Sequence, residues 1–169
     1  LHEYRRLYPD VHITVQRSYG SRVPAQVLDY GADFGVITFR PDTAALTSIV
    51  VYHDELAFVV PPSHPLARRG KVSISELAPE SFVAHHVASP YRLRVIETFK
   101  KKRVDLRMPV EMPTIDAIKK FVAMGNSVAL LPAITVEREL AHKELVRVQV
   151  PELTFERKLR LIHRREGTL

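Results

Sequence analysis

The side chains best suited to chemistry in this sequence are histidines, arginines and hydroxyl residues close to predicted turns. His85 and His86 are adjacent. Neighbouring residues of a strand point to opposite faces, so we do not expect both rings to bind one metal ion. One of the two is expected to donate to a ligand or to a carbonyl group of the core, and these alternatives stay open. The chain has no cysteine, which excludes disulfides, thiolate nucleophiles and cysteine-based metal centres.

Sequence motifs of enzymes are missing. The chain contains no G-x-S-x-G nucleophile elbow and no glycine-rich phosphate loop of the G-x-G-x-x-G or G-x-x-x-x-G-K type. No acid–base constellation accompanies its serines. We therefore expect neither a hydrolase nor a nucleotide cofactor.

Predicted helix starts offer a different chemistry, the binding of anions. Three of them carry hydroxyl residues, at 18–21, 89–92 and 114–115. A helix start presents unpaired backbone N–H groups and the positive end of the helix dipole, which suit a carboxylate. The alternative is that Ser and Thr only cap these helices. Arg40 and Arg92 are further candidates, since a guanidinium binds a carboxylate in a bidentate geometry, unless they are simply solvated.

The hydrophobic pattern places these residues between strands and helices. Near-continuous apolar runs such as 33–39 and 128–132 indicate buried strands, and Ser73 to Glu76 matches a capping box. We also expect Ser21 and Thr135 to cap helices, and residues 11–17, 46–52, 56–60, 81–86, 104–112, 145–150 and 158–162 to form strands. Alternation of strands and helices favours an α/β fold with mainly parallel sheets, whose ligands bind at the carboxyl ends of strands.

Composition indicates a globular domain. The 169 residues are 46% hydrophobic and 26% charged, and the net charge of +6 raises the question of nucleic-acid binding. The densest basic run, 100–103, ends a predicted helix, where cations complement the helix dipole, and no DNA-binding motif accompanies it. No apolar stretch is long enough to span a membrane. The chain begins with a predicted helix rather than a signal peptide, so we expect a cytoplasmic segment of a longer protein.

Four motifs occur in a characteristic order along nearly the whole chain. They are Leu7-Tyr8-Pro9-Asp10-Val11, the run Gly31 to Ile37, the segment Pro61-Pro62-Ser63-His64-Pro65-Leu66-Ala67, and the run Met124 to Pro132. In these motifs the sequence resembles the effector-binding domain of LysR-type bacterial transcriptional regulators. The "P-x-x-HPLA" segment is the most specific of the four.

The resemblance implies a two-lobed fold similar to type 2 periplasmic binding proteins, with crossover strands joining the lobes. Lobe I would comprise residues 1–57 and 150–169, without the family's first strand and C-terminal helix, and lobe II residues 58–149. A small effector would bind in the interlobe cleft. The positions matching that cleft are Ser18, Thr38, Arg40, His85, His86, Ser89, Tyr91, Arg92 and Thr114.

The resemblance also implies a function that is not enzymatic and needs no cofactor and no metal. The chain would be the ligand-sensing domain of a regulator that binds a small anionic metabolite, forms a homodimer or homotetramer, and contacts promoter DNA only through an N-terminal winged helix-turn-helix outside this sequence. The alternative is a solute-binding protein of a transporter, which would have a signal peptide upstream. An enzyme on the same scaffold is a third possibility and would show turnover.

Overall fold

The computed structural model describes residues 1–87, 89–125 and 127–165, and its chain divides into two compact units. Unit 1 comprises Leu1–Val51 and Leu159–Leu169, and unit 2 comprises Tyr52–Lys158. The chain passes between the units inside two strands, β2 (Leu46–Val60) and β7 (Glu156–Arg164). The predicted lobe boundaries at residues 57 and 150 therefore differ from the division into compact units.

Unit 1 is built around the antiparallel pair of β1 (Phe34–Ile37) and β7, whose register runs from Phe34↔His163 to Ile37↔Arg160. Helix α2 (Val23–Leu28) packs on β1 at Gly35, where an added Cβ would lie 2.3 Å from Val23 Cγ1. The absence of a side chain at Gly35 thus permits the close contact of helix and strand. The buried cluster of this unit consists of Val27, Ile37, Leu46 and Ile162.

Helix α1 (His2–Leu7) begins unit 1 and has no buried residue. The segment that follows it does not form the strand predicted over 11–17. Although its residues alternate as in a strand, no strand is assigned there in the structure, and most of its side chains are exposed. A strand needs a neighbour for its backbone hydrogen bonds, and the described residues provide none beside this segment.

Unit 2 contains the second half of β2, which pairs antiparallel with β5 (Ala129–Pro132) and with β6 (Val146–Val148). β3 (Ser81–His85) pairs in parallel with β4 (Arg107–Met112). Short 3-10 helices occupy the connections: η1 (Pro65–Arg68), η2 (Ile74–Leu77), η3 (Ala133–Thr135) and η4 (Pro151–Leu153).

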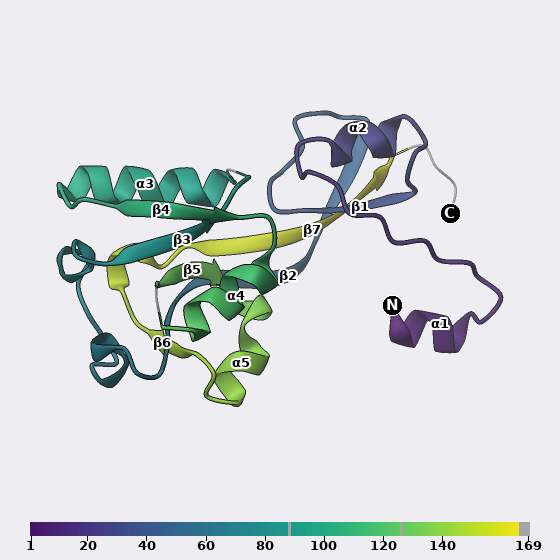
Figure 1. Cartoon of the computed structure of the whole chain (residues 1–169). Helices are drawn as coiled ribbons and strands as arrows, with labels where there is room; N and C mark the ends of the chain where they lie inside the picture. The colour runs from purple at the N-terminus through teal and green to yellow at the C-terminus, as the bar shows by residue number, and fades with distance from the viewer. Residues whose placement is uncertain (88, 126, 166–169) are drawn as a thin grey trace. The chain divides into compact units, whose positions relative to one another are not determined.

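The helices of unit 2 cover both faces of the β3–β4 pair, α3 (Pro90–Lys102) on one side and α4 (Ile115–Ala123) on the other (Figure 1). Phe82 of β3 belongs to the same buried cluster as Phe99 of α3, whereas its neighbour Val83 shares a cluster with Ile118 of α4. Such alternation is expected of a strand buried on both faces. The short helix α5 (Glu137–Ala141) follows η3.

Strand direction differs from the prediction of mainly parallel sheets. The α/β class is confirmed, but the register pairs of β1 with β7, β2 with β5 and β2 with β6 are antiparallel. β3 runs parallel with β4, and the isolated bridges of Phe82 with Val128 and of Lys71 with Gln149 are parallel too. The reason is that β2 and β7 carry the chain from one unit to the other and back. The two predicted strands 46–52 and 56–60 are also one continuous strand of 15 residues.

The predicted helix starts are confirmed in three places and wrong in two. Ser89 and Thr114 are N-caps, and the Glu76 carboxylate accepts a hydrogen bond from the Ser73 backbone N–H at 2.8 Å. Ser21 does not cap, because the N-cap position of α2 lies one residue later, at Arg22, with Pro24 in the first turn. Thr135 instead donates its hydroxyl to the Pro132 carbonyl at 2.7 Å.

Candidate functional site

Arg92, at the start of α3, is the centre of a polar cluster in unit 2. Its Nη1 donates to the carbonyl oxygen of His85, at the end of β3, at 2.8 Å, and its Nη2 donates to the carboxylate of Glu111 on β4. The Arg92 side chain is only 19% exposed, and its Nε is buried without a hydrogen-bond partner. The predicted effector arginine therefore already binds a carboxylate that belongs to the protein.

The two histidines of this cluster lie side by side. Their rings stack with centroids 4.9 Å apart and an interplanar angle of 21°. We predicted opposite faces, which is wrong because the strand ends at His85 and His86 leaves the alternating pattern. His85 Nδ1 accepts from the Val87 N–H at 3.1 Å, whereas His86 Nδ1 lies 3.3 Å from the Met112 carbonyl oxygen. In the neutral form, these contacts place the ring hydrogen of His85 on Nε2 and that of His86 on Nδ1.

The hydroxyl groups predicted to bind anions act as helix caps. Ser89 Oγ accepts from the Arg92 backbone N–H at 3.1 Å, and Thr114 Oγ1 accepts from the Ala117 N–H at 3.1 Å. The ring of Tyr91, half-buried at the same end of α3, has the guanidinium carbons of Arg157 and Arg94 at 5.3 and 5.9 Å from its centroid. These distances are those of cation–π contacts.

Three predicted site residues belong to unit 1. Ser18 is half-buried in the extended segment after α1, and Thr38 is half-buried directly after β1. Arg40 is exposed and lines a surface hollow of about 1090 Å³ together with Arg160 and Arg165. The structure thus brings His85, His86, Ser89 and Arg92 together in unit 2, and Thr38 and Arg40 close together along the chain in unit 1.

Sequence reasoning missed Glu111, Arg160 and Arg165. A signal existed for Glu111, since β3 and β4 are parallel and the carboxyl ends of parallel strands meet at one edge. Arg160 and Arg165 come near Arg40 through the pairing of β7 with β1, a contact between segments far apart in the sequence. Nothing in the local sequence indicates that pairing.

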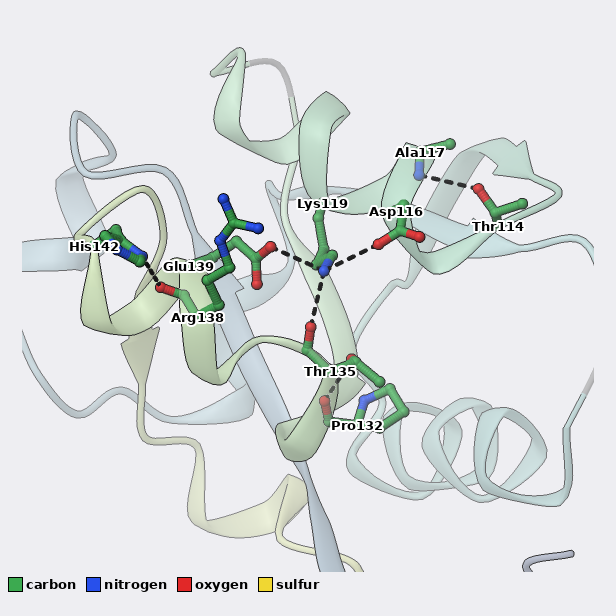
Figure 2. A network of polar contacts seen from close by, with 9 residues as sticks. All are labelled: Thr114, Asp116, Ala117, Lys119, Pro132, Thr135, Arg138, Glu139 and His142. Atoms are coloured by element: carbon green, nitrogen blue, oxygen red, sulfur yellow. Dashed lines mark hydrogen bonds and ion pairs between the residues drawn. The ribbon is translucent and has the colours of Figure 1, made fainter. Parts of the chain in front are cut away.

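A network around Lys119 fixes α4, the helix that Thr114 caps (Figure 2). Lys119 Nζ lies 2.9 Å from Glu139 of α5, 3.1 Å from Asp116 and 3.0 Å from the Thr135 carbonyl oxygen. Burial opposes the charged form of Lys119, but its hydrogen bonds to Glu139 and Asp116 outweigh this effect and raise its pKa. α4 is therefore anchored at its middle to the segment that follows β5.

Three or more metal-ligating side chains do not gather anywhere in the described part of the chain. A membrane-spanning helix is likewise not found among the residues that the structure describes.

Comparison with known proteins relates this arrangement to a family. A family model described as the LysR substrate binding domain matches residues 1–169. The chain belongs to this family. It is 24% identical over 163 residues to the HTH-type transcriptional regulator CysL of Bacillus subtilis, covering 96% of this chain and 54% of CysL. The chain spans about half the length of the curated relatives it matches.

Solved LysR-type domains have the same fold. The CcmR regulatory domain of Synechocystis PCC6803, solved in complex with 2-PG, has a TM-score of 0.86 and 23% identity, with 99% of this chain and 81% of that chain covered. The effector-binding domain of QuiR, solved in complex with shikimate, has a TM-score of 0.78 and 17% identity, with 99% and 80% covered. The predicted similarity to type 2 periplasmic binding proteins is confirmed at the level of the fold.

Proposed function

We propose that this LysR-type domain senses a small anionic metabolite and transmits its binding to the assembly and promoter contacts of a transcriptional regulator. The observation that carries the proposal is the Arg92 cluster, a guanidinium held in carboxylate-binding geometry where β3, β4 and α3 meet. The ligands of two similar domains support it, since CcmR was solved with 2-PG and QuiR with shikimate, a carboxylate.

Arg92 would bind its effector by exchanging partners. In this structure the Glu111 carboxylate accepts a hydrogen bond from Nη2 of Arg92, while the buried Nε has no acceptor. An effector carboxylate that reached Arg92 would compete with Glu111 and release it. Such an exchange gives the bound and free states different contacts, which any ligand-driven change of conformation requires.

The remaining predicted positions complete the proposed site. Ser18, Thr38 and Arg40 in unit 1 would contribute together with His85, His86, Ser89, Tyr91, Arg92 and Thr114 in unit 2. The predicted lobes, 1–57 with 150–169 and 58–149, would enclose the effector between them. Catalysis is not part of the proposal, since the relatives are transcriptional regulators.

A ligand screen on the full-length protein tests the proposal. Shikimate and other small organic acids should raise the melting temperature of the protein, because a ligand that binds only the folded state stabilises it. Arg92→Ala and Arg40→Ala should each reduce that shift, whereas Glu111→Gln should strengthen binding by removing the competing carboxylate. Arg107→Ala, an exposed residue at the other end of β4, is the matched control and should bind as wild type.

Two results would contradict the anionic effector. One is the absence of any thermal shift with organic acids, and the other is a shift that persists in the double variant Arg40→Ala/Arg92→Ala. Either result would leave the family membership intact and redirect the search to neutral ligands.

Control of transcription would depend on the rest of the protein. The relatives are HTH-type regulators about twice as long as this chain, so DNA binding is proposed for a segment outside it, with the protein acting in the cytoplasm as a homodimer or homotetramer. We expect the exposed α1 segment to contribute to that assembly through Leu1, Tyr4, Leu7 and Tyr8. Promoter binding that responds to the effector, and a lower molecular mass in solution for Leu7→Asp, are the expected results.

A further inference from the structure

The hollow of unit 1 is lined by a loop whose two ends are held beside β7 and the residue that directly follows it. This loop, residues 38–45, leaves β1 at Ile37, which is the register partner of Arg160. At its other end the Ala45 carbonyl accepts from the Arg165 backbone N–H at 2.9 Å. Pro41, in the middle of the loop, is buried. The loop is therefore held in place along β7, and the hollow of about 1090 Å³ that it lines is preformed.

Three arginines line this hollow. They are Arg40 from the loop, Arg160 from within β7, and Arg165 directly after β7. Within the described residues none of the three guanidinium groups makes a hydrogen bond or an ion pair, and the one acidic lining residue is Asp42. Arg160 is half-buried. A partly desolvated guanidinium without a counter-charge is unfavourable, so an anion in the hollow would stabilise it.

A hydroxyl group provides an independent observation that points to ligand binding. Ser48 on β2 also lines the hollow, and its Oγ is buried without a hydrogen-bond partner in the structure. Buried polar atoms are nearly always hydrogen-bonded, which makes an unpaired one informative. Thr43 and Thr47 add two more hydroxyls to the lining, and Thr43 Oγ1 already accepts from the Ala45 N–H at 3.3 Å, which leaves its own proton to be donated.

We propose that this hollow binds a compact dianion, a phosphate or a dicarboxylate. Three arginines and one aspartate leave two positive charges on the lining, which a dianion neutralises. Phosphate and carboxylate oxygens match the fork of donors on a guanidinium, and the unpaired hydroxyl of Ser48 supplies a further donor. The inference goes beyond the proposed effector role, because Arg160 and Arg165 are not among the effector residues and no residue of unit 2 lines this hollow.

Calorimetric titration of the full-length protein with inorganic phosphate and, separately, with succinate tests the proposal and distinguishes the two ligand types. At least one probe should bind, and Arg160→Gln and Arg165→Gln should each weaken it about tenfold or more, the effect of losing one charge-assisted contact. Ser48→Ala should weaken it less. Arg69→Gln removes the same charge from unit 2, where Arg69 pairs with Glu76, and should leave the affinity unchanged.

The outcomes separate this site from the effector site. Loss of phosphate or succinate binding in Arg165→Gln with retained binding in Arg92→Ala supports the proposal, whatever the organic-acid screen gives. Failure of both probes to bind, equal affinity in wild type and Arg165→Gln, or an equal loss in Arg69→Gln would overturn it. Arg165 is exposed, so its substitution keeps the test valid even if Arg160→Gln fails to fold.

Discussion

His64, in the most specific of the sequence motifs, uses both ring nitrogens to hold a turn. Its Nδ1 accepts from the Leu66 N–H at 3.2 Å and caps η1, and its Nε2 lies 3.1 Å from the carboxylate of Glu80. The His64 and Glu80 side chains are 15% and 18% exposed. The motif that pointed to the family is thus explained by structure rather than by ligand binding.

Substitution of His64 should therefore destabilise the fold. His64→Ala removes the cap of η1 and leaves Glu80 poorly solvated without a partner, so we expect the free energy of unfolding to fall by about 1–2 kcal/mol. Urea denaturation followed by circular dichroism measures this. His53→Ala is the matched control, because His53 pairs with Glu156 in solvent and should leave the denaturation midpoint unchanged. A similar loss in both variants would contradict the role given to His64.

Gly35 permits the packing of α2 on β1. An added methyl group would lie 2.3 Å from Val23 Cγ1 and 3.0 Å from Ile162 Cγ1, so Gly35→Ala should lower the free energy of unfolding by about 1–3 kcal/mol. At Gly20 the nearest atom, Phe39 Cε1, is 3.9 Å away. Gly20→Ala should therefore change the stability by less than about 0.5 kcal/mol in the same urea denaturation. Equal stability of the two variants would argue against the close contact.

Helices α4 and α5 are joined by the ion pair of Lys119 with Glu139, and this contact should depend on pH. Burial raises the pKa of Glu139, but its hydrogen bond and charge interaction with Lys119 outweigh that effect, so the pKa lies below its ordinary 4.5. The pKa of Lys119 lies above its ordinary 10.5. Glu139 contributes stability above pH 4.5 that is lost as the pH falls through its lowered pKa, and Lys119 contributes below pH 10.5 until the pH rises through its raised pKa.

Lys119→Met should accordingly lower the free energy of unfolding by about 2 kcal/mol at pH 7, because it leaves Glu139 half-desolvated and unpaired. The double variant Lys119→Met/Glu139→Leu should recover much of that loss. Thermal denaturation between pH 3 and pH 11 measures both effects. Lys101→Met, which breaks the exposed pair with Glu97, is the control and should lower the free energy of unfolding at pH 7 far less, because solvent screens that pair. An equal loss in both variants would contradict the role given to Lys119.

Elements marked by local chemistry were predictable, and elements that depend on distant partners were not. Ser89 and Thr114 begin helices because their hydroxyls satisfy backbone N–H groups a few residues away. The 11–17 segment has the alternation of a strand, but the part of the chain that the structure describes offers it no neighbouring strand. β2 crosses its polar stretch around Asp54 unbroken because Arg157 of β7 pairs with that buried carboxylate and Ile134 donates to it.

The candidate site follows the same division. The sequence indicates Arg92, because it lies in the first turn of a capped helix, and Arg40, because it follows an apolar run typical of a strand. That strand is less buried than predicted, since Phe34 and Val36 of β1 are exposed. The sequence does not indicate that the Glu111 carboxylate pairs with Arg92, nor that Arg160 and Arg165 line the same hollow as Arg40. These contacts result from strand registers, which tertiary packing determines.

Buried apolar side chains are unevenly distributed between the two units. The buried cluster of unit 1 has four described residues, whereas the two clusters of unit 2 have 15 and 9. Large apolar side chains of unit 1 such as Tyr30, Val36 and Val15 are exposed by 80%, 59% and 74%. Because apolar burial is the main source of stability, unit 1 should open at a lower free energy than unit 2.

Hydrogen–deuterium exchange measured by mass spectrometry tests this difference. The amides of β1 should exchange faster than those of β5, although both strands are hydrogen-bonded on at least one side. Along β2 the exchange rate should vary, with slow exchange of the amides from Ala57 to Val60 and faster exchange of those near Leu46. Equal protection of β1 and β5 would show that the units do not differ in local stability.

The basic hollow lies in unit 1, the less buried of the two. An anion that settles there would tie the 38–45 loop to β7 through charges rather than through apolar packing, which that unit largely lacks. Anion binding in the hollow would then slow the local opening of the backbone in unit 1, the less stable unit. This effect needs no large displacement.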